Sequence, residues 1–319
     1  MKHLTVIGAL LLLAVIPLQA QSQRQSKPEP IIFTPQWTAQ AQFAGYYVAK
    51  EKGFYDEEGI DVQIVHPNAT QSSEERIRNN TSHVTTLQLA QAIQIISDGV
   101  PLVNLLQTSL NNALVIVSRR GKNPLNQRGA RVAIWQAGFT QLAECMVKES
   151  QLDYEWIKAA NSVNLFIAGA VDASVAMSYN EYFQILQSGI SITEDYVYRL
   201  SDHNYNIQED GLYMTRAYYQ NHKEEADKFA RASRRGWEYV AEHPEEALDI
   251  VMEYVQRNFI ATNRVIQGLM LQEILRLQLD PDTGERAFLL RPDMLEKASD
   301  LMLRNGEIKR PITMEDLSR

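Results

Sequence analysis

Short apolar runs alternate with segments of helical spacing through the first two thirds of the chain. Ile31–Phe33 is apolar, Ala41–Glu51 follows with helical spacing and ends just before Gly53, and Ile60–Ile64 alternates apolar with polar residues. A period of two is typical of a strand, and a glycine after a helical segment is typical of a helix end. Strands and helices in this order predict an α/β fold with a mostly parallel sheet.

The same pattern continues to Thr215 and then changes to helices alone. The further strands that we expect are Val84–Leu87, Pro101–Gln107, Leu114–Ser118, Arg131–Trp135, Val171–Met177, Tyr196–Leu200 and Gly211–Thr215. The helices that we expect between them are Glu74–Asn79, Leu89–Ser97, Thr140–Ser150, Val163–Gly169 and Tyr179–Gln187. The helices that we expect after them are Glu224–Ala241, Glu245–Val255, Arg264–Leu277, Pro292–Arg304 and Glu315–Arg319.

The first twenty residues have the pattern of a signal peptide. Lys2 gives a positive start, Val6–Pro17 is apolar, and Leu18–Ala20 forms a passable cleavage site before Gln21. A membrane anchor is the alternative, but the apolar stretch is shorter than the roughly 20 residues that span a bilayer. We therefore expect cleavage before Gln21, a polar leader over residues 21–30, and an exported, soluble, periplasmic protein.

Composition and charge exclude several kinds of partner and chemistry. The formal charge is −8, and it becomes −9 without residues 1–20, which hold one lysine and no acidic residue. Such an acidic protein is unsuited to nucleic acid or anionic lipid. Cys145 is the single cysteine, so an internal disulfide is excluded, and the six histidines show no metal-ligand spacing. Because no phosphate-binding loop or hydrolase motif is present, we expect a protein that binds a small molecule without transforming it.

Six segments of the chain resemble substrate-binding proteins of ABC importers in the sulfonate, nitrate and thiamine-precursor group. The first segment, WTAQAQFAGYYVAKEKGFYDEEGIDV at Trp37–Val62, is the most specific for this group. The others are DGVPLVNLLQ (Asp98–Gln107), GARVAIWQAG (Gly129–Gly138), NLFIAGAVDASVAMSYNEY (Asn164–Tyr182), EDGLYMTRAYY (Glu209–Tyr219) and SRRGWEYVAEHPEEALDIVMEYV (Ser233–Val255). The similarity runs over nearly the whole chain after the leader. It is closest to the branch for hydroxymethylpyrimidine-type thiamine precursors.

The resemblance implies a two-lobed periplasmic binding protein of type II, with two hinge strands that cross between the lobes. The chain length independently favours two lobes, because it exceeds what one hydrophobic core usually serves. The expected crossings are Leu114–Ser118 and Gly211–Thr215, with residues 31–117 plus 212–319 in lobe 1 and residues 118–211 in lobe 2. The implied function is capture of an aminopyrimidine-type thiamine precursor. A monomer without a cofactor or metal would deliver it to an ABC permease and its ATPase.

The expected ligand residues of lobe 1 lie where strands end, because open α/β sheets bind ligands there. They are Trp37, Gln40, Gln42, Phe43, Gln88 and Asn112. Trp37 offers a flat apolar wall with one N–H donor, or it packs within the lobe. Phe43 stands where relatives carry a polar group, which implies stacking on the ligand. Gln88 and Asn112 are amides at strand edges that either orient a heterocycle or only bond a loop.

The expected ligand residues of lobe 2 follow two strands. They are Gly138, Phe139, Thr140, Tyr179, Asn180 and Glu181. The first three start a helix whose free N–H groups can hold an anionic oxygen, although capping alone explains Thr140. Glu181 is the first candidate for a ligand contact, since its carboxylate can accept N–H bonds from an aminopyrimidine. Its alternative role is that of an acidic residue at a helix N-terminus, which the helix dipole stabilises. Glu209 and Asp210, which precede the return strand, face either the cleft or the hinge.

Other functions stay open at this point. An alkanesulfonate, taurine or nitrate carrier of the same fold is one, and like-charge repulsion disfavours it if Glu181 lines the cleft. An enzyme similar to the fungal pyrimidine synthase is another, which uses a lysine-bound pyridoxal phosphate and a cysteine-rich iron motif. No lysine occurs between Lys52 and Lys122, where that lysine is expected, and Cys145 alone cannot form the iron motif. A sensory role beside a receptor is not decided by the sequence.

Overall fold

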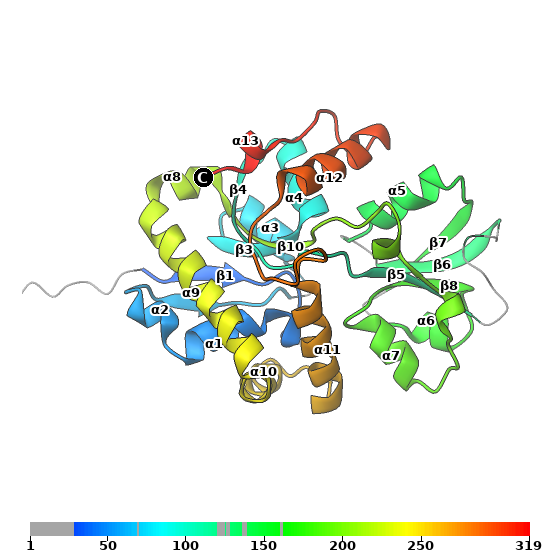
Figure 1. Cartoon of the computed structure of the whole chain (residues 1–319), viewed down its shortest axis with the longest axis horizontal. Coiled ribbons are helices and arrows are strands. Elements are labelled where there is room, and N and C mark those ends of the chain that lie inside the picture. The colour runs from blue at the N-terminus through cyan, green and yellow to red at the C-terminus, as the bar shows by residue number, and fades with distance from the viewer. Residues whose placement is uncertain (1–28, 69, 120–124, 126–127, 136–138, 160–161) are drawn as a thin grey trace, which may run out of the picture.

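The computed structural model describes residues 29–68, 70–119, 125, 128–135, 139–159 and 162–319. Over these residues the chain folds into two lobes, each built around one sheet, and the lobes lie side by side (Figure 1). The expected signal peptide and nearly all of the expected leader fall at residues 1–28, outside the described part. Within the described part, no helix is both long and apolar enough to cross a membrane.

The first sheet has five strands in the order β2-β1-β3-β10-β4. β1 pairs in parallel with β2 and β3, whereas β10 runs antiparallel to both of its neighbours. The bounds are Ile31–Thr34 for β1, Val62–Ile64 for β2, Val84–Gln88 for β3, Leu102–Gln107 for β4 and Asp210–Thr215 for β10. Every residue of β3 and β10 is buried, as expected for central strands that helices cover on both faces.

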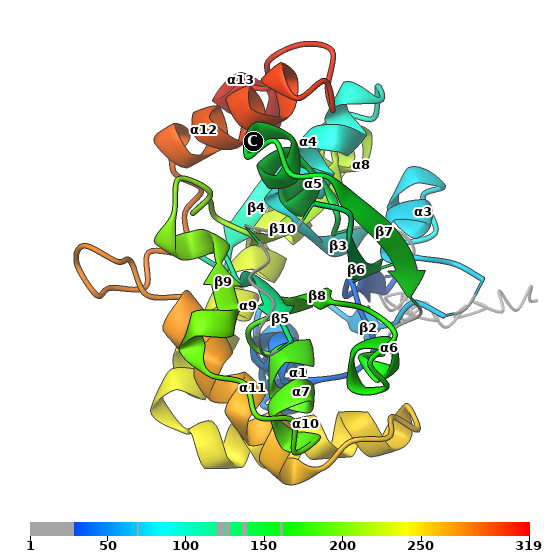
Figure 2. The ribbon, with the colours of Figure 1, turned by 90° about the vertical axis from the view of Figure 1, so that its right-hand side faces the viewer.

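The second sheet also has five strands, in the order β7-β6-β8-β5-β9. Figure 2 turns this lobe toward the viewer. Here β5 is the strand that runs antiparallel to its neighbours, β8 and β9. The bounds are Leu114–Ser118 for β5, Ala130–Trp135 for β6, Tyr154–Ala159 for β7, Ala173–Met177 for β8 and Val197–Arg199 for β9. Each sheet is therefore mixed, with one antiparallel strand, and the predicted α/β fold with two lobes is confirmed.

The helices flank the two sheets, and the C-terminal part is almost entirely helical. The helices of the first half are α1 (Ala44–Glu51), α2 (Phe54–Glu57), α3 (Ser73–Arg78), α4 (Leu89–Ser97) and α5 (Gln141–Glu149), with the 3-10 helix η1 (Ala41–Phe43) before α1. Those of the second half are α6 (Asn164–Ile167), α7 (Glu181–Gln187), α8 (Arg216–Asn221), α9 (Lys223–Glu242), α10 (Pro244–Arg257), α11 (Arg264–Leu277), α12 (Pro292–Arg304) and α13 (Met314–Leu317). The predicted helical C-terminal part is confirmed.

The predicted stop after the first helix has a clear cause in the backbone. Gly53 has a φ of +77° and ends α1, and Gly59 has a φ of +73° and ends α2. Residues with a side chain rarely adopt this left-handed conformation, and glycine adopts it without a steric cost. The two glycines therefore turn the chain from α1 back into strand β2.

Several predicted elements need correction. Strand β7 was not predicted, because Glu155 and Lys158 interrupt its apolar residues. It forms the edge of its sheet and pairs only with β6, and edge strands tolerate exposed charged side chains. The helix predicted from Tyr179 begins two residues later as α7, and the helix predicted at Val163–Gly169 is the shorter α6.

The chain crosses between the lobes before β5 and again before β10. Glu209 joins these two connections, because its carboxylate accepts hydrogen bonds from Asn112 Nδ2 at 2.8 Å and from the Ala113 backbone N–H at 2.9 Å. The strands predicted as crossings, Leu114–Ser118 and Gly211–Thr215, instead follow the crossings directly, as β5 of the second sheet and β10 of the first, and β10 begins at Asp210. The buried Glu209 carboxylate therefore links the two connections of the hinge by hydrogen bonds.

Helix α1 packs closely on α9, which runs across it in Figure 1. Gly45 of α1 lies against the ring of Trp237, and Gly236 of α9 lies against the Gly45 carbonyl oxygen. Trp237 is fully buried in the main hydrophobic cluster. This contact fixes the position of α1 and therefore of the loop from Thr34 to Phe43 that leads into it.

Candidate functional site

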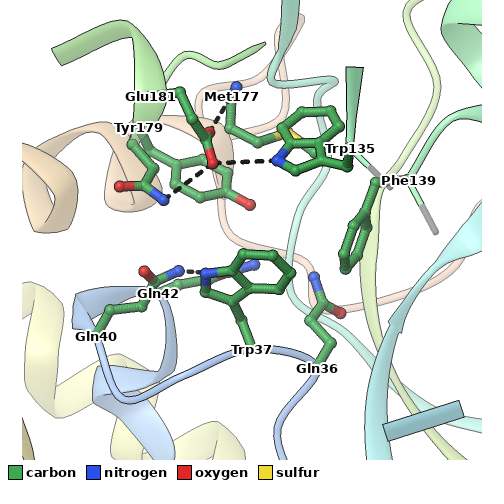
Figure 3. Close-up of a pocket in the computed structure, with 10 residues that line it drawn as sticks. Gln36, Trp37, Gln40, Gln42, Trp135, Phe139, Met177, Tyr179 and Glu181 are labelled. Carbon is green, nitrogen blue, oxygen red and sulfur yellow. Dashed lines mark hydrogen bonds between the residues drawn. The ribbon is translucent and has the colours of Figure 1, made fainter. Parts of the chain in front are cut away.

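A pocket lies between the two lobes, where strands β1, β6 and β8 end (Figure 3). It opens to solvent. The lobe 1 residues that line it are Gln36, Trp37, Gln40 and Gln42, and the lobe 2 residues are Trp135, Phe139, Met177, Tyr179, Asn180 and Glu181. Its position at the carboxyl ends of parallel strands is the usual ligand position in open α/β folds.

Aromatic rings form much of the wall. The ring centroids of Trp37 and Phe139 are 5.6 Å apart in an edge-on contact between the lobes, and those of Trp135 and Phe139 are 6.1 Å apart. Phe139 has a φ of +59°, which is strained for a residue with a bulky side chain. Such strain is often found at binding sites. A planar ligand can lie between Trp37 and Phe139 only if the two rings separate.

Glu181 is the acidic group of the upper wall in Figure 3. It is 7% exposed, and one carboxylate oxygen accepts hydrogen bonds from Trp135 Nε1 and from Asn180 Nδ2, each at 3.3 Å. The other oxygen accepts one from the Met177 backbone N–H at 3.1 Å. Burial raises the pKa of Glu181, although these N–H groups lower it in part. A carboxylate has about four acceptor positions, so capacity for a ligand N–H remains.

A second acid lies behind the lower wall. Asp210 accepts hydrogen bonds from Gln36 Nε2 at 2.9 Å and from Gln42 Nε2 at 2.7 Å. Gln42 in turn accepts one from Gln40 Nε2 at 2.6 Å. Burial raises the pKa of Asp210, which these two amides lower in part. The network holds the glutamines of the wall in one orientation.

Three buried carboxyl groups meet around Tyr179. Burial first, and then the charges of Asp210, Glu209 and Glu181, raise the pKa of the Tyr179 phenol. Burial also raises the pKa of Glu209 well above its usual range. All hydrogen bonds that described residues donate to these carboxyl groups come from neutral amide, indole or backbone N–H groups. The site therefore favours a ligand that donates hydrogen bonds or is positively charged, and it disfavours an anion.

His66 holds the loop that carries Trp37. Its Nδ1 lies 2.7 Å from the Trp37 carbonyl oxygen, and its Nε2 lies 2.9 Å from the Tyr47 hydroxyl. Because a carbonyl only accepts, we assign the ring proton to Nδ1, and Nε2 accepts from Tyr47. Burial lowers the pKa of His66 to about 4, so the neutral form that these two hydrogen bonds require is stable at neutral pH.

We expect the stability that His66 contributes to decline in mild acid. An unfolded histidine binds a proton near pH 6.5 and His66 only near pH 4, so the unfolded state gains protons first as the pH falls. Relative to His66→Gln, the wild-type protein should lose about 2 kcal/mol of unfolding free energy between pH 7 and pH 5. Urea titrations of both proteins at the two pH values measure this. An equal difference at both pH values would contradict it.

The structure brings together most of the residues expected at the site. Those that line the pocket are Trp37, Gln40, Gln42, Phe139, Tyr179, Asn180 and Glu181. The residues that the sequence did not indicate are Gln36, Trp135 and Met177. Trp135 and Met177 are the last residues of β6 and β8. Trp37 is expected at the site because it lies near the end of a strand, and the same reason would have indicated Trp135 and Met177.

Other expected residues lie elsewhere. Phe43 is 1% exposed, packs in the hydrophobic core beside His66 and does not line the pocket, so its predicted stacking role is wrong. Asn112 binds the hinge carboxylate of Glu209. Gln88 lies outside the pocket, with its Nε2 3.9 Å from Met177 Sδ in the other lobe. Thr140 is the N-cap residue of α5 and makes no side-chain capping bond.

Part of the expected anion site lies outside the described residues, because Gly138 is not among them. That site stays a prediction. The described residues contain no group of three or more histidine, cysteine, aspartate or glutamate side chains that could hold a metal ion. Cys145, expected to fill space in the core, is buried.

The chain is similar in sequence and in structure to several known proteins. A formylaminopyrimidine-binding protein from Halalkalibacterium halodurans is 24% identical over 270 residues, which are 79% of this chain and 79% of that protein. The periplasmic aliphatic sulphonate binding protein SsuA from Escherichia coli has a similar structure, with a TM-score of 0.62, 13% identity and 92% coverage of both chains.

The alkanesulfonate-binding protein SsuA from Xanthomonas axonopodis pv. citri, bound to MOPS, gives a TM-score of 0.65 at 11% identity, over 92% of this chain and 99% of that one. These structural neighbours confirm the periplasmic-binding-protein fold. The family described as NMT1/THI5 like matches residues 40–247, well over half of the sequence. The chain therefore belongs to the NMT1/THI5-like family.

Proposed function

We propose that this protein captures a small nitrogen-containing ring compound of the aminopyrimidine type between its lobes and delivers it to an ABC permease. The supporting observation is the combination of aromatic walls from Trp37 and Phe139 with the buried Glu181 carboxylate, which has only neutral partners among the described residues. A flat ring suits the aromatic walls. An exocyclic amino group suits a buried carboxylate that still has acceptor capacity.

The relatives support a thiamine precursor over an anion. The formylaminopyrimidine-binding protein shares the ring type that we propose, whereas the two SsuA proteins are named for sulfonates. A sulfonate group needs hydrogen-bond donors or cations around it. The acids Glu181, Glu209 and Asp210 around Tyr179 provide the opposite environment. We therefore place the ligand with the pyrimidine branch.

The proposal also covers location and assembly state. We propose that the protein acts in the periplasm, after export, as a monomer that binds its ligand without reaction. The lobes that close on the ligand meet at the two crossings, with β5 in the second lobe and β10 in the first. None of the described residues that line the pocket is a lysine, cysteine or histidine, so they offer no side chain for a pyridoxal phosphate linkage.

Titration calorimetry on protein that has been unfolded, washed and refolded, to remove any ligand that co-purifies, tests the proposal. We expect saturable heat with 4-amino-5-hydroxymethyl-2-methylpyrimidine, and none with taurine or nitrate at the same concentrations. Heat with taurine alone would instead place the protein with the sulfonate carriers. An imine absorbance band with pyridoxal phosphate would contradict the proposal by reopening the enzyme function.

A further inference from the structure

Three glutamines and one aspartate form a chain of hydrogen bonds along the lower wall of the pocket. Gln40 Nε2 donates to Gln42 Oε1, and Gln42 Nε2 donates to one carboxylate oxygen of Asp210. Gln36 Nε2 donates to the other carboxylate oxygen. The three glutamines line the pocket, whereas Asp210 does not. All the N–H groups in this network therefore point along the chain toward Asp210.

Asp210 fixes the direction of each of these bonds. A carboxylate has acceptor oxygens and no donor, so Gln36 and Gln42 must turn their NH₂ groups toward it and their oxygens away from it. Gln42 then has only its oxygen left for Gln40, so Gln40 must donate in turn. The charge of one buried side chain thus decides which atom of each glutamine is free.

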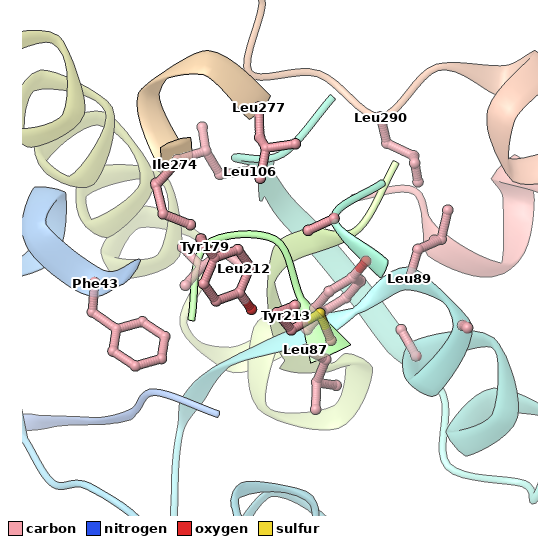
Figure 4. Close-up of a cluster of buried hydrophobic side chains, with 14 of the residues drawn as sticks. Phe43, Leu87, Leu89, Leu106, Tyr179, Leu212, Tyr213, Ile274, Leu277 and Leu290 are labelled. Carbon is pink, nitrogen blue, oxygen red and sulfur yellow. The ribbon is translucent and has the colours of Figure 1, made fainter. Parts of the chain in front are cut away.

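The surroundings of Asp210 make these bonds costly to lose. It is the first residue of β10 and is 8% exposed. Figure 4 shows hydrophobic side chains packed around this part of β10, among them Leu87 and Leu212. Within the described part of the chain, Gln36 and Gln42 are the only side chains that donate to the Asp210 carboxylate. Turning either amide would place an oxygen against a buried charge, which is unfavourable.

The network ends in two amide oxygens that face no donor. Gln36 is 4% exposed, and its Oε1 is buried without a hydrogen-bond partner among the described residues. Gln40 is 5% exposed, and its Nε2 is the atom that binds Gln42, which leaves its Oε1 as the free end. Buried acceptors are rarely left unpaired. Two acceptors on residues that line the pocket indicate a ligand that donates to this wall.

We propose that Asp210 is a positioning residue that sets the specificity of the pocket, because it makes Gln36 and Gln40 present acceptor oxygens to the ligand. This inference rests on the proposed function, since it requires a ring in the pocket. It adds that the ring carries a second N–H or O–H donor, on a different edge from the amino group that binds Glu181. Asp210 acts through the glutamines and does not touch the ligand.

The Asp210→Asn variant is expected to reverse part of the network. Asparagine has one oxygen and one NH₂ group, so one of the two glutamines beside it must turn its oxygen inward. If Gln36 turns, its NH₂ group takes the place of the free oxygen. If Gln42 turns, Gln40 must turn with it, and the NH₂ group of Gln40 becomes the free end. In either case one acceptor of the lower wall becomes a donor.

Two ligands measure this change by titration calorimetry at a pH at which both are neutral. Besides the 4-amino group, 2,4-diaminopyrimidine carries a second donor, whereas 4-amino-2-methoxypyrimidine carries an acceptor at the same carbon. We expect the wild-type protein to bind the diamino compound at least about tenfold more tightly, because the methoxy oxygen would face amide oxygens and leave them unpaired. In Asp210→Asn this preference should fall toward one.

Two further variants keep the test decisive. Gln36→Leu keeps the bond between Gln42 and Asp210 but removes one free oxygen, so it should lose part of the preference even if Asp210→Asn does not fold. Asp282→Asn, exposed and outside the pocket, should keep the full preference.

The possible outcomes separate this inference from the proposed function. No preference in the wild-type protein, or an unchanged preference in folded Asp210→Asn, would overturn the inference. A full preference in Gln36→Leu would do the same where Asp210→Asn does not fold. If the wild-type protein binds no aminopyrimidine, including 4-amino-5-hydroxymethyl-2-methylpyrimidine, the proposed function fails instead.

Discussion

The Glu181→Gln variant is expected to bind 4-amino-5-hydroxymethyl-2-methylpyrimidine about 10 to 150 times more weakly than the wild-type protein. This range corresponds to about 1.5–3 kcal/mol, the scale of one hydrogen bond to a charged group. Glutamine keeps the size of the side chain and an acceptor oxygen, but it removes the negative charge. Its NH₂ group would also replace one of the two oxygens and so face either the Trp135 N–H or the Met177 N–H, which now donate to different oxygens of Glu181.

The pH dependence of the same titration adds an independent readout. Burial raises the pKa of Glu181, so protonation removes the charged acceptor at a higher pH than for an exposed glutamate. As the pH falls through that raised pKa, the ratio of wild-type to Glu181→Gln affinity should fall toward one.

The matched control is Glu194→Gln in the same lobe. Glu194 is exposed, pairs with Arg199 and does not line the pocket, so its variant should bind like the wild-type protein. Equal binding by Glu181→Gln and Glu194→Gln would remove Glu181 from the ligand contacts. A ratio of affinities that did not change with pH would show that the charge of Glu181 is not what the ligand uses.

The Gly236→Ala variant is expected to lose at least about 2 kcal/mol of unfolding free energy, or not to fold. A Cβ atom at this position would lie 2.0 Å from the Gly45 carbonyl oxygen and 2.9 Å from the Ala49 Cβ atom. Both are parts of helix α1, so the helices α1 and α9 would have to separate. Overpacking of this kind typically costs about 1–3 kcal/mol and sometimes more, which exceeds the roughly 1 kcal/mol gained by placing alanine in a helix.

The control for this variant is Gly268→Ala in helix α11. A Cβ atom there would meet only Leu248 Cδ2, at 3.4 Å, so the gain in helix propensity should remain and stability should be equal or higher. Thermal unfolding of the two variants and the wild-type protein measures the difference. Equal stability of the two variants would show that α1 and α9 do not pack as closely as described. In Gly236→Ala, separation of α1 from α9 should also weaken ligand binding, because α1 positions the loop from Thr34 to Phe43 that carries Trp37.

The sequence could predict the parts of the fold that have local causes. The left-handed glycines Gly53 and Gly59 and the alternation of strands and helices are such features. Strand β7 has charged residues at positions that only its edge placement explains. That placement follows from the pairing with β6, which is not a local property of the segment.

The candidate site was predictable in part for a similar reason. The ends of strands meet at one edge of a sheet, and this rule selected Trp37 and Glu181 correctly as neighbours of one pocket. The rule does not say which face of the following helix is buried, and Phe43 proved to face the core. Asn112 binds Glu209, a residue 97 positions later in the chain. Such a contact depends on how the two lobes are joined.

One nitrogen-containing ring is expected to lie between the lobes and to donate a hydrogen bond to Glu181. A crystal structure of the protein grown with 4-amino-5-hydroxymethyl-2-methylpyrimidine tests it most directly. We predict density for the ring between Trp37 and Phe139, with the exocyclic amino nitrogen about 3 Å from a Glu181 carboxylate oxygen. Density for the ligand at any other place, or a ring whose amino group points away from Glu181, would contradict the account.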